Sequence, residues 1–196
     1  QSAFADSPLT STDFSKAYHN EKIVILASGT KGLLTRELME WLASEDNPVA
    51  VKMAVINRLG WDTEKRENSS AFFNYLKESK GYKDKTDFEK KGKDFEFLCM
   101  AYLKAMENYF EVEEALVLAK KAQSKNPGSY TFNIITALIE AQIMSGTFDW
   151  CEVFNLTNRI REDKSLIQDM RTEAVDIIFC YMDGYKDYCP EGSRKL

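Results

Sequence analysis

The chain has 196 residues, of which 44% are hydrophobic and 12% aromatic, enough to bury one sizeable core. Its formal net charge of -5 gives no general attraction to DNA, RNA or acidic lipid, which argues against a nucleic-acid partner. No run approaches the roughly 20 apolar residues that cross a bilayer, so we expect one folded domain without a membrane span.

Residues 1–12 are expected to form a polar leader. The chain starts at Gln1 instead of Met, and QSAFADSPLTST reads like a segment that follows a cleavage site. Removal of an export signal or an artificial boundary would each explain this start. We favour export, to the periplasm, the cell surface or the extracellular space.

Residues 22–38, KIVILASGTKGLLTREL, allow two interpretations. An apolar run, then glycines, then a helical rhythm is typical of a strand, a phosphate-binding loop and a helix. Such a loop needs a parallel sheet and the pattern G-x-x-x-x-G-K-[ST], which SGTKGLL does not satisfy. We therefore favour a first helix that holds residues 23–27, has its caps at residues 11–13 and ends at Gly29, with a strand as the alternative.

Apolar residues then recur at helical spacing along the rest of the N-terminal third. Asn47 and Pro48 end one helix and start the next, which we expect to close in a left-handed turn at Gly60. The side chains of residues 68–70, NSS, are expected to cap a short helix that ends near Gly81.

The second half predicts further helices without a convincing strand pair. They cover about 87–106, 112–125 before Asn126-Pro127-Gly128, 130–145, 153–160 and 170–181, and a loose tail follows from Asp183. Residues 130–145 are apolar on most sides and should lie at the centre of the fold. The sequence thus predicts an all-α fold of about seven to eight helices stacked as antiparallel hairpins.

One unit carries a resemblance to a known repeat family. In AYLKAMENYFEVEEALVLAKKAQSKNP, Ala115, Ala122 and Pro127 match the small–small–proline spacing of a tetratricopeptide repeat, and Tyr102 takes the aromatic place in its first helix. The resemblance covers roughly residues 95–181, with Ala137 on the next small position. It implies a right-handed α–α superhelix and a protein or peptide partner.

A second resemblance concerns separate segments. VKMAVINRLGWDTEKRENSSAFFNYL, FDWCEVFNLTNRI and DMRTEAV are similar to segments of exported proteins of gut Bacteroidetes. This resemblance implies export and the same architecture, and it implies no activity.

The resulting expectation is a single domain over residues 1–196. It consists of the leader 1–12, N-terminal helices 13–86, tetratricopeptide-like hairpins 87–183 and a tail 184–196. If the repeat alignment holds, the inner face of the stack presents a mixed apolar and polar groove, formed by Lys93, Glu96, Met100, Leu103 and Lys104, then Thr131, Ile134, Leu138 and Gln142.

We therefore expect a non-enzymatic interaction module that binds a peptide, a protein or a glycan. The candidate binding residues are Lys93, Glu96, Lys104, Gln142 and Trp150, the last because an indole at a helix boundary can anchor a partner. Trp61 is a similar boundary indole. A homo-oligomer is possible, and a purely structural subunit is a third interpretation.

The main alternative is a hydrolase, or its accessory subunit, that uses carboxylates in a cleft between helices. Glu140 is unusual among the acids, because it lies in an apolar helix, where its carboxylate must reach the solvent-exposed edge or find a hydrogen-bond donor. The only histidine, His19, has no catalytic partner at a suitable spacing and is expected on the surface. We expect no catalytic residue, metal or cofactor.

The four cysteines contain no CxxC pair, so their spacing supports neither a zinc site nor thioredoxin-like chemistry. Cys99 and Cys180 fall on apolar helix faces, where a buried thiol acts as a small hydrophobe. A disulfide would need export and a suitable Cα separation. We favour free thiols for at least two of the four.

Overall fold

The computed structural model describes residues 7–60 and 66–190, and over these ranges the fold is all-α, as predicted. Ten α-helices and two short 3-10 helices (η) follow one another there, more than the seven or eight expected, and no strand occurs. In chain order they are η1 Phe14–Tyr18, α1 Lys22–Ser28, α2 Arg36–Leu42, α3 Val49–Gly60, α4 Asn68–Lys80, α5 Lys85–Lys91, α6 Asp94–Glu107, α7 Glu113–Lys125, α8 Tyr130–Gly146, α9 Trp150–Glu162, α10 Thr172–Met182 and η2 Asp183–Tyr188.

The additional elements arise where a predicted helix is broken. Gly92 separates α5 from α6, because its ψ angle of 145° lies outside the helical range. A Cβ at this position would lie 2.8 Å from the Phe88 ring and 2.9 Å from the Phe97 ring, so a larger residue does not fit. The single first helix expected before Gly29 is divided into η1 and α1. Gly29 does cap α1, and the strand alternative for this region is wrong.

Two local signals were misread because tertiary contacts decide them. Gly60 is the last residue of α3, and a Cβ there would collide with the Met106 side chain, so the glycine permits close approach of α6. Residues 68–70 do not cap α4. Asn68 instead accepts a hydrogen bond from the Leu34 amide (3.0 Å), and Ser69 donates its hydroxyl to Glu107 (2.6 Å).

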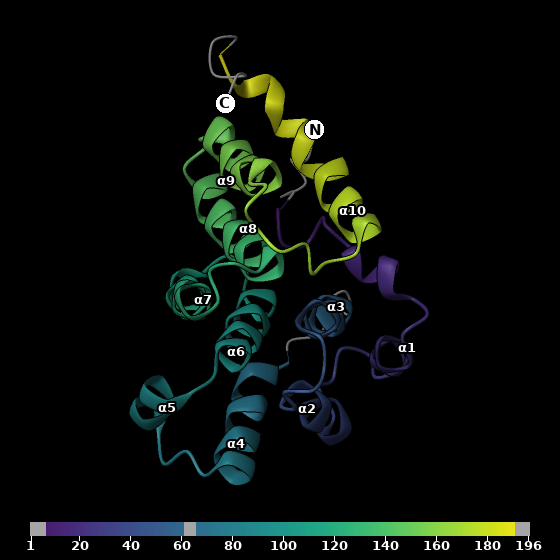
Figure 1. Ribbon diagram of the computed structural model, residues 1–196, viewed down its shortest axis with the longest axis vertical. Helices are drawn as coiled ribbons and strands as arrows, with labels where there is room; N and C mark the ends of the chain where they lie inside the picture. Colours follow the sequence, from purple (N-terminus) through teal and green to yellow (C-terminus); the bar gives the residue numbers. More distant parts are fainter. Residues whose placement is uncertain (1–6, 61–65, 191–196) are drawn as a thin grey trace.

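The helices stack along the long axis of the molecule (Figure 1). α6, α7, α8 and α9 pack in chain order, each against the next. The other helices pack differently: α10 contacts η1 and η2 more extensively than α9, and α3 packs on α6, α1 and η1. None of the described helices is long and apolar enough to cross a bilayer.

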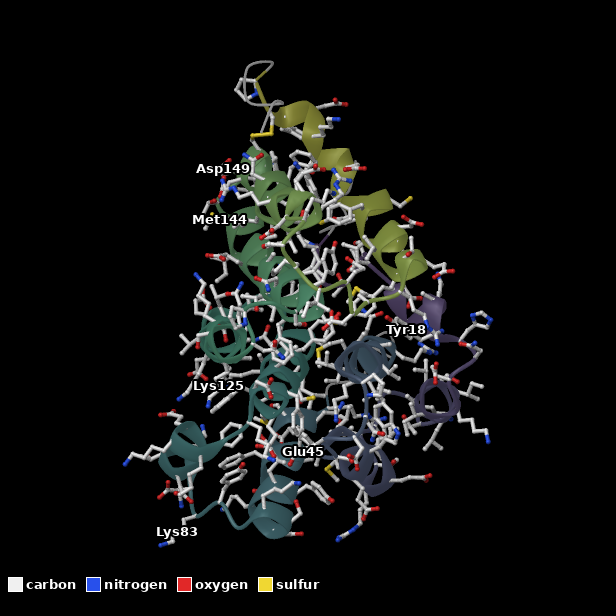
Figure 2. The ribbon with its side chains drawn as sticks, in the orientation of Figure 1. Tyr18, Glu45, Lys83, Lys125, Met144 and Asp149 are labelled. Carbon is white, nitrogen blue, oxygen red and sulfur yellow. A yellow bond between two sulfur atoms is a disulfide. The ribbon has the colours of Figure 1, made fainter. Side chains whose placement is uncertain are left out.

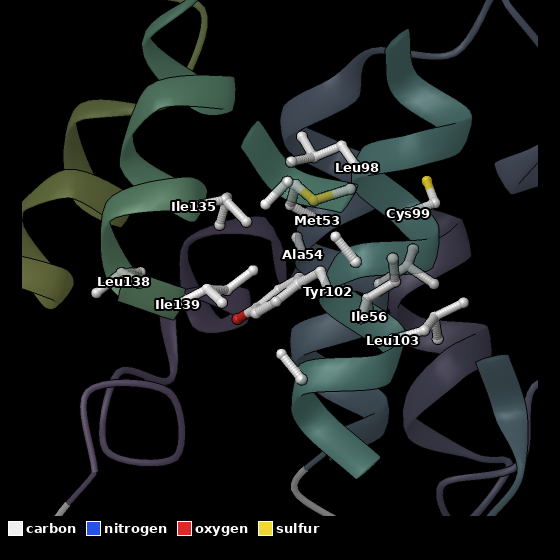
Figure 3. Packing of buried hydrophobic residues seen from close by; sticks show 14 of the residues in the cluster. Met53, Ala54, Ile56, Leu98, Cys99, Tyr102, Leu103, Ile135, Leu138 and Ile139 are labelled. Atoms are coloured by element: carbon white, nitrogen blue, oxygen red, sulfur yellow. The ribbon is translucent and has the colours of Figure 1, made fainter. Parts of the chain in front are cut away.

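The core lies where α3, α6 and α8 meet (Figure 3). Met53 of α3, Leu98 and Tyr102 of α6, and Ile135 and Ile139 of α8 are all fully buried. In α8, every residue from 130 to 139 is buried, which confirms the predicted central position of this helix. Burial of this kind contributes about 1.5–3 kcal/mol for each large apolar side chain.

Arg171, at the start of α10, joins the C-terminal part of the chain to the N-terminal part. Its guanidinium donates to the carbonyl of Ala17 and to Asn20 Oδ1, both at 2.8 Å, and it forms an ion pair with Glu21. The same group lies 4.6 Å from the centre of the Tyr18 ring. These bonds fix α10 against η1.

Both ends of the described chain pack against the body. Ser7, Leu9 and Thr12 are buried, although they belong to the segment expected as a polar leader. The expected loose tail is replaced by η2, which packs on α9, and by a disulfide between Cys151 and Cys189.

Candidate functional site

A cleft of about 930 Å³ lies where α8 ends and α9 begins. Met144 and Asp149, labelled in Figure 2, bracket the turn that forms one edge. Three stretches of chain supply its aromatic lining: Tyr109 and Phe110 from the α6–α7 connection, Phe148 and Trp150 from the α8–α9 turn, and Tyr181, Tyr185 and Tyr188 from α10 and η2. We call this the aromatic cleft.

Trp150, the first residue of α9, is the centre of the ring contacts. It stacks on Tyr185 with 5.5 Å between ring centroids and 10° between planes. Phe148 meets it edge-on at 5.8 Å, and Tyr188 lies at 6.2 Å. The hydroxyls of Tyr181 and Tyr185 are 2.6 Å apart and share a hydrogen bond. The indole therefore holds together residues that are far apart in sequence.

Phe148 has an unusual backbone. Its φ angle is 61°, in the left-handed region that costs a bulky L-residue about 1–2 kcal/mol. Asp149 fixes the chain directly after it by accepting a hydrogen bond from the Glu152 amide (3.0 Å), which caps α9. Backbone strain of this kind is concentrated at functional sites.

The rim of the aromatic cleft exposes large apolar side chains. Phe148 is 75% exposed, Phe110 73% and Tyr188 62%. Aromatic rings left in water at one place, beside a concave surface, are typical of a recognition site.

Besides the tyrosine hydroxyls, the described polar side chains that line the aromatic cleft are those of Ser7, Glu113, Gln142, Ser145 and Thr147. Gln142 on α8 accepts a hydrogen bond from the Ser7 hydroxyl, and this pair closes one side. Glu113, at the start of α7, supplies an exposed carboxylate. Among the described lining residues there is no lysine, arginine or histidine, so the fixed charge of the lining is negative.

The disulfide fastens one wall of the cleft. Cys151 lies in the first turn of α9 and Cys189 directly follows η2, so the bond holds Tyr185 and Tyr188 beside Trp150. Cys99 and Cys180 are free thiols, in agreement with the expectation of at least two. Cys99 is buried, and burial raises the pKa of its thiol to about 12. Cys180 is exposed and lines the cleft, so its predicted burial is wrong.

The structure brings together two of the five predicted binding residues. Gln142 and Trp150 both line the aromatic cleft. Lys93 lies elsewhere, in an ion pair with Glu45. Lys104 pairs with Glu114 at 2.7 Å on the rim of a separate hollow of about 350 Å³ between α4, α5 and α7.

Glu96 has a structural role in α6. It is fully buried and accepts hydrogen bonds from the Lys93 amide (2.9 Å) and the Tyr82 hydroxyl (2.6 Å). Burial, followed by the bond to Glu96, raises the pKa of Tyr82 well above its ordinary value. Glu96 therefore caps the helix and faces no solvent.

The residues of the predicted inner groove do not form one continuous surface. Leu103, Thr131, Ile134 and Leu138 are buried along with Glu96, so this part of the predicted groove belongs to the core. Lys93, Met100, Lys104 and Gln142 keep exposed surface, and they lie apart on three separate hollows.

Lys52 is an unusual residue that the sequence analysis did not identify. Its side chain is almost completely buried, donates to the carbonyls of Leu42 (2.8 Å) and Ser44, and lies 4.5 Å from the centre of the Phe95 ring. Burial lowers the pKa of this ammonium group. Because it binds the carbonyls at the end of α2, Lys52 acts as a C-terminal cap.

The residues considered for catalysis have other positions. The Glu140 side chain is partly exposed at the surface of α8 and pairs with Lys120 at 2.7 Å. This acid therefore finds the donor that was expected for it. His19 is on the surface, as expected. Within residues 7–60 and 66–190, no group of three His, Cys, Asp or Glu side chains could hold a metal ion. Trp61 lies outside the described residues.

Several cleft residues escaped the sequence analysis: Phe110, Phe148, Tyr185 and Tyr188. The density of aromatic residues in NYF, TFDW and GYKDYC was a usable signal. What it lacked was proximity, because these motifs are up to about 80 residues apart and only the packing of α10 and η2 brings them together.

No family model matches the chain, no curated protein matches it, and no solved structure matches it.

Proposed function

We propose that this chain is a non-enzymatic interaction module that binds a peptide segment of a protein partner in the aromatic cleft. The observation that carries the proposal is the convergence of seven aromatic side chains from three stretches on one cleft, with Phe110 and Phe148 exposed at its rim. Trp and Tyr provide much of the binding energy at protein interfaces. The strained backbone at Phe148 adds support, since it presents this ring to solvent.

A peptide fits this cleft better than a glycan does. Recognition of a glycan needs several polar side chains to bond its hydroxyls. Here Ser7 bonds Gln142, and the hydroxyls of Ser145 and Thr147 donate to backbone carbonyls of α8. The volume of the cleft falls in the range of about 300–1,000 Å³ that is usual for small-ligand sites, enough for a few side chains of an extended segment.

The proposal includes a tetratricopeptide-like architecture and export. The chain-order packing of α6, α7, α8 and α9 supports the tetratricopeptide-like architecture, with the ligand at the end of the stack instead of on its inner face. The disulfide between Cys151 and Cys189 supports export, because such bonds persist in oxidising compartments.

Selection from a random dodecapeptide phage library tests the binding function. Peptides enriched on the wild-type protein should lose at least about tenfold in affinity for the double variant Phe110→Ser/Phe148→Gly. The matched control is Ile25→Ser/Leu33→Ser, which removes two exposed apolar side chains away from the cleft and should leave binding unchanged. Equal binding to all three proteins, or enrichment of no peptide, contradicts the proposal.

The hydrolase alternative has less support. Cleavage of a glycosidic bond needs two carboxyl groups across the substrate, and Glu113 is the one carboxylate among the described residues that line the aromatic cleft. Mass spectrometry of the selected peptides, or of a glycan array incubated with the protein, would reveal turnover and reverse this preference.

A further inference from the structure

Several aromatic rings of the protein carry one of its own cations over a face. Arg171 lies over Tyr18, Lys52 over Phe95 and Arg161 over Phe179, at 4.6, 4.5 and 4.1 Å from the ring centres. Among the described residues, no lysine or arginine lies over Phe110, Phe148 or Tyr188, although these rings are exposed. Tyr109 packs against Phe110 with 4.3 Å between ring centroids, and the exposed surfaces of the three rim rings remain accessible to a cation from outside.

The charges around these rings have the complementary sign. Glu113 lines the cleft, and the exposed carboxylates of Glu111, Asp149 and Asp187 are adjacent in sequence to lining residues. Lys186 is the one cation that adjoins the lining in the same way. A cleft with an excess of carboxylates attracts a positively charged ligand and repels an acidic one.

We infer that the aromatic cleft recognises an arginine side chain of an extended peptide segment, which stacks on a rim ring and pairs with the Glu113 carboxylate. This inference rests on the proposed function and specifies its ligand. Arginine fits better than lysine, because its planar guanidinium stacks on aromatic faces and offers two parallel N–H groups to a carboxylate.

Titration of two synthetic heptapeptides tests the inference. The first is acetyl-Gly-Pro-Leu-Arg-Leu-Pro-Gly-amide, and the second carries citrulline, a neutral group of the same shape, in place of arginine. The indole N–H signal of Trp150 in ¹⁵N-labelled protein, assigned with Trp150→Phe, reports binding. We expect the arginine peptide to bind at least about fivefold more tightly than the citrulline peptide, and more weakly in 500 mM than in 50 mM NaCl.

A pair of neighbouring carboxylates supplies the matched variants. Glu113→Gln should lower the affinity for the arginine peptide about fivefold and leave the affinity for the citrulline peptide unchanged. Glu114→Gln should change neither, because Glu114 pairs with Lys104 and does not line the cleft. Both positions are exposed, so each variant should keep the fold, which the remaining signals of the same spectra verify.

The outcomes separate this inference from the proposed function. Equal affinity for the two heptapeptides, no effect of Glu113→Gln, or no binding at 10 mM peptide overturns the arginine assignment. If the phage library meanwhile yields neutral peptides that need Phe110 and Phe148, the binding function stands with another ligand chemistry. If the library yields nothing either, both fall.

Discussion

Phe148 has two features that a folded chain normally avoids, a left-handed backbone and a largely exposed aromatic ring. The surrounding structure maintains both, through the cap made by Asp149 and the edge-on contact with Trp150. A residue retained at a stability cost is a good candidate for a binding role.

Two substitutions at Phe148 should differ in their effect on stability and have the same effect on binding. Phe148→Gly removes the ring and the strain, so the free energy of unfolding should stay the same or rise by about 1 kcal/mol. Phe148→Ala removes the ring alone and should lower it by about 1 kcal/mol. Both variants should lower the affinity for the peptides selected from the phage library at least about tenfold. Urea unfolding and peptide titration measure the two quantities; equal stability of the variants would contradict the strain argument.

Buried thiol and phenol groups predict sensitivity to alkaline pH. Burial raises the pKa values of Cys99 and Tyr130 to about 12, whereas the unfolded chain loses these protons near 9 and 10. The folded state therefore binds more protons above about pH 9, and its stability falls as the pH rises towards 12.

Urea midpoints between pH 8 and 11 measure this effect. We expect a continuous decrease in the free energy of unfolding above about pH 9. The double variant Cys99→Ala/Tyr130→Phe should show a shallower decrease, although it is less stable at pH 8. A slope equal to that of the wild type would show that these two groups do not control the alkaline loss.

At the scale of the elements, local sequence signals worked where the chain alone sets the end of a helix. Gly29 and Gly81 follow α1 and α4 as predicted, and Asn126 follows α7. The signal failed at Gly60, where the Met106 side chain of α6 occupies the space of a Cβ, and no local pattern contains that contact. It also failed at Gly92, where the crowding comes from the nearby Phe88 and Phe97.

η2 is the element whose position depends most on a covalent bond. The disulfide closes a sequence separation of 38 residues, which by loop entropy stabilises the fold by about 4 kcal/mol. The double variant Cys151→Ser/Cys189→Ser should lower the free energy of unfolding, measured in urea, by about this amount. It should also make Lys186 accessible to trypsin. Its affinity for the selected peptides should fall, because Tyr185 and Tyr188 leave the wall of the cleft.

Cys180→Ser is the control for the disulfide variant. It removes a free, exposed thiol from the same cleft and should leave stability and trypsin cleavage unchanged. Reduction of the wild type should reproduce the double variant. If reduced protein kept full affinity for the peptides, the disulfide would have no role in holding the site.

At the scale of the whole molecule, Arg171 joins the C-terminal helix α10 to the N-terminal element η1. It holds α10 against η1 across more than 150 residues of sequence, through bonds to Ala17 and Asn20. η2 directly follows α10 and packs on α9, so this contact helps to place Tyr185 and Tyr188 in the aromatic cleft.

Loss of the Arg171 side chain should therefore affect both stability and the site. Arg171→Met removes several charged hydrogen bonds and should lower the free energy of unfolding by about 3 kcal/mol. Arg159→Met, which breaks an exposed pair with Glu152, should cost less than about 1 kcal/mol. Hydrogen exchange of α10 should accelerate in the first variant alone; equal effects of the two substitutions would contradict the proposed role of Arg171.

The sequence by itself determined the all-α class, the central position of α8 and most helix ends, because apolar periodicity and capping residues act within a few residues of chain. It also predicted Trp150 and Gln142 as binding residues, and both line the aromatic cleft, although Gln142 was expected on the inner face of the hairpins; their binding role stays a prediction. Tertiary structure alone decided that Leu103, Ile134 and Leu138 of the predicted inner face belong to the core, that Lys52 and Glu96 are buried, and that aromatic residues from three distant stretches meet in one cleft. The physical reason is that helix formation depends on local spacing, whereas a site depends on which faces exclude water against one another.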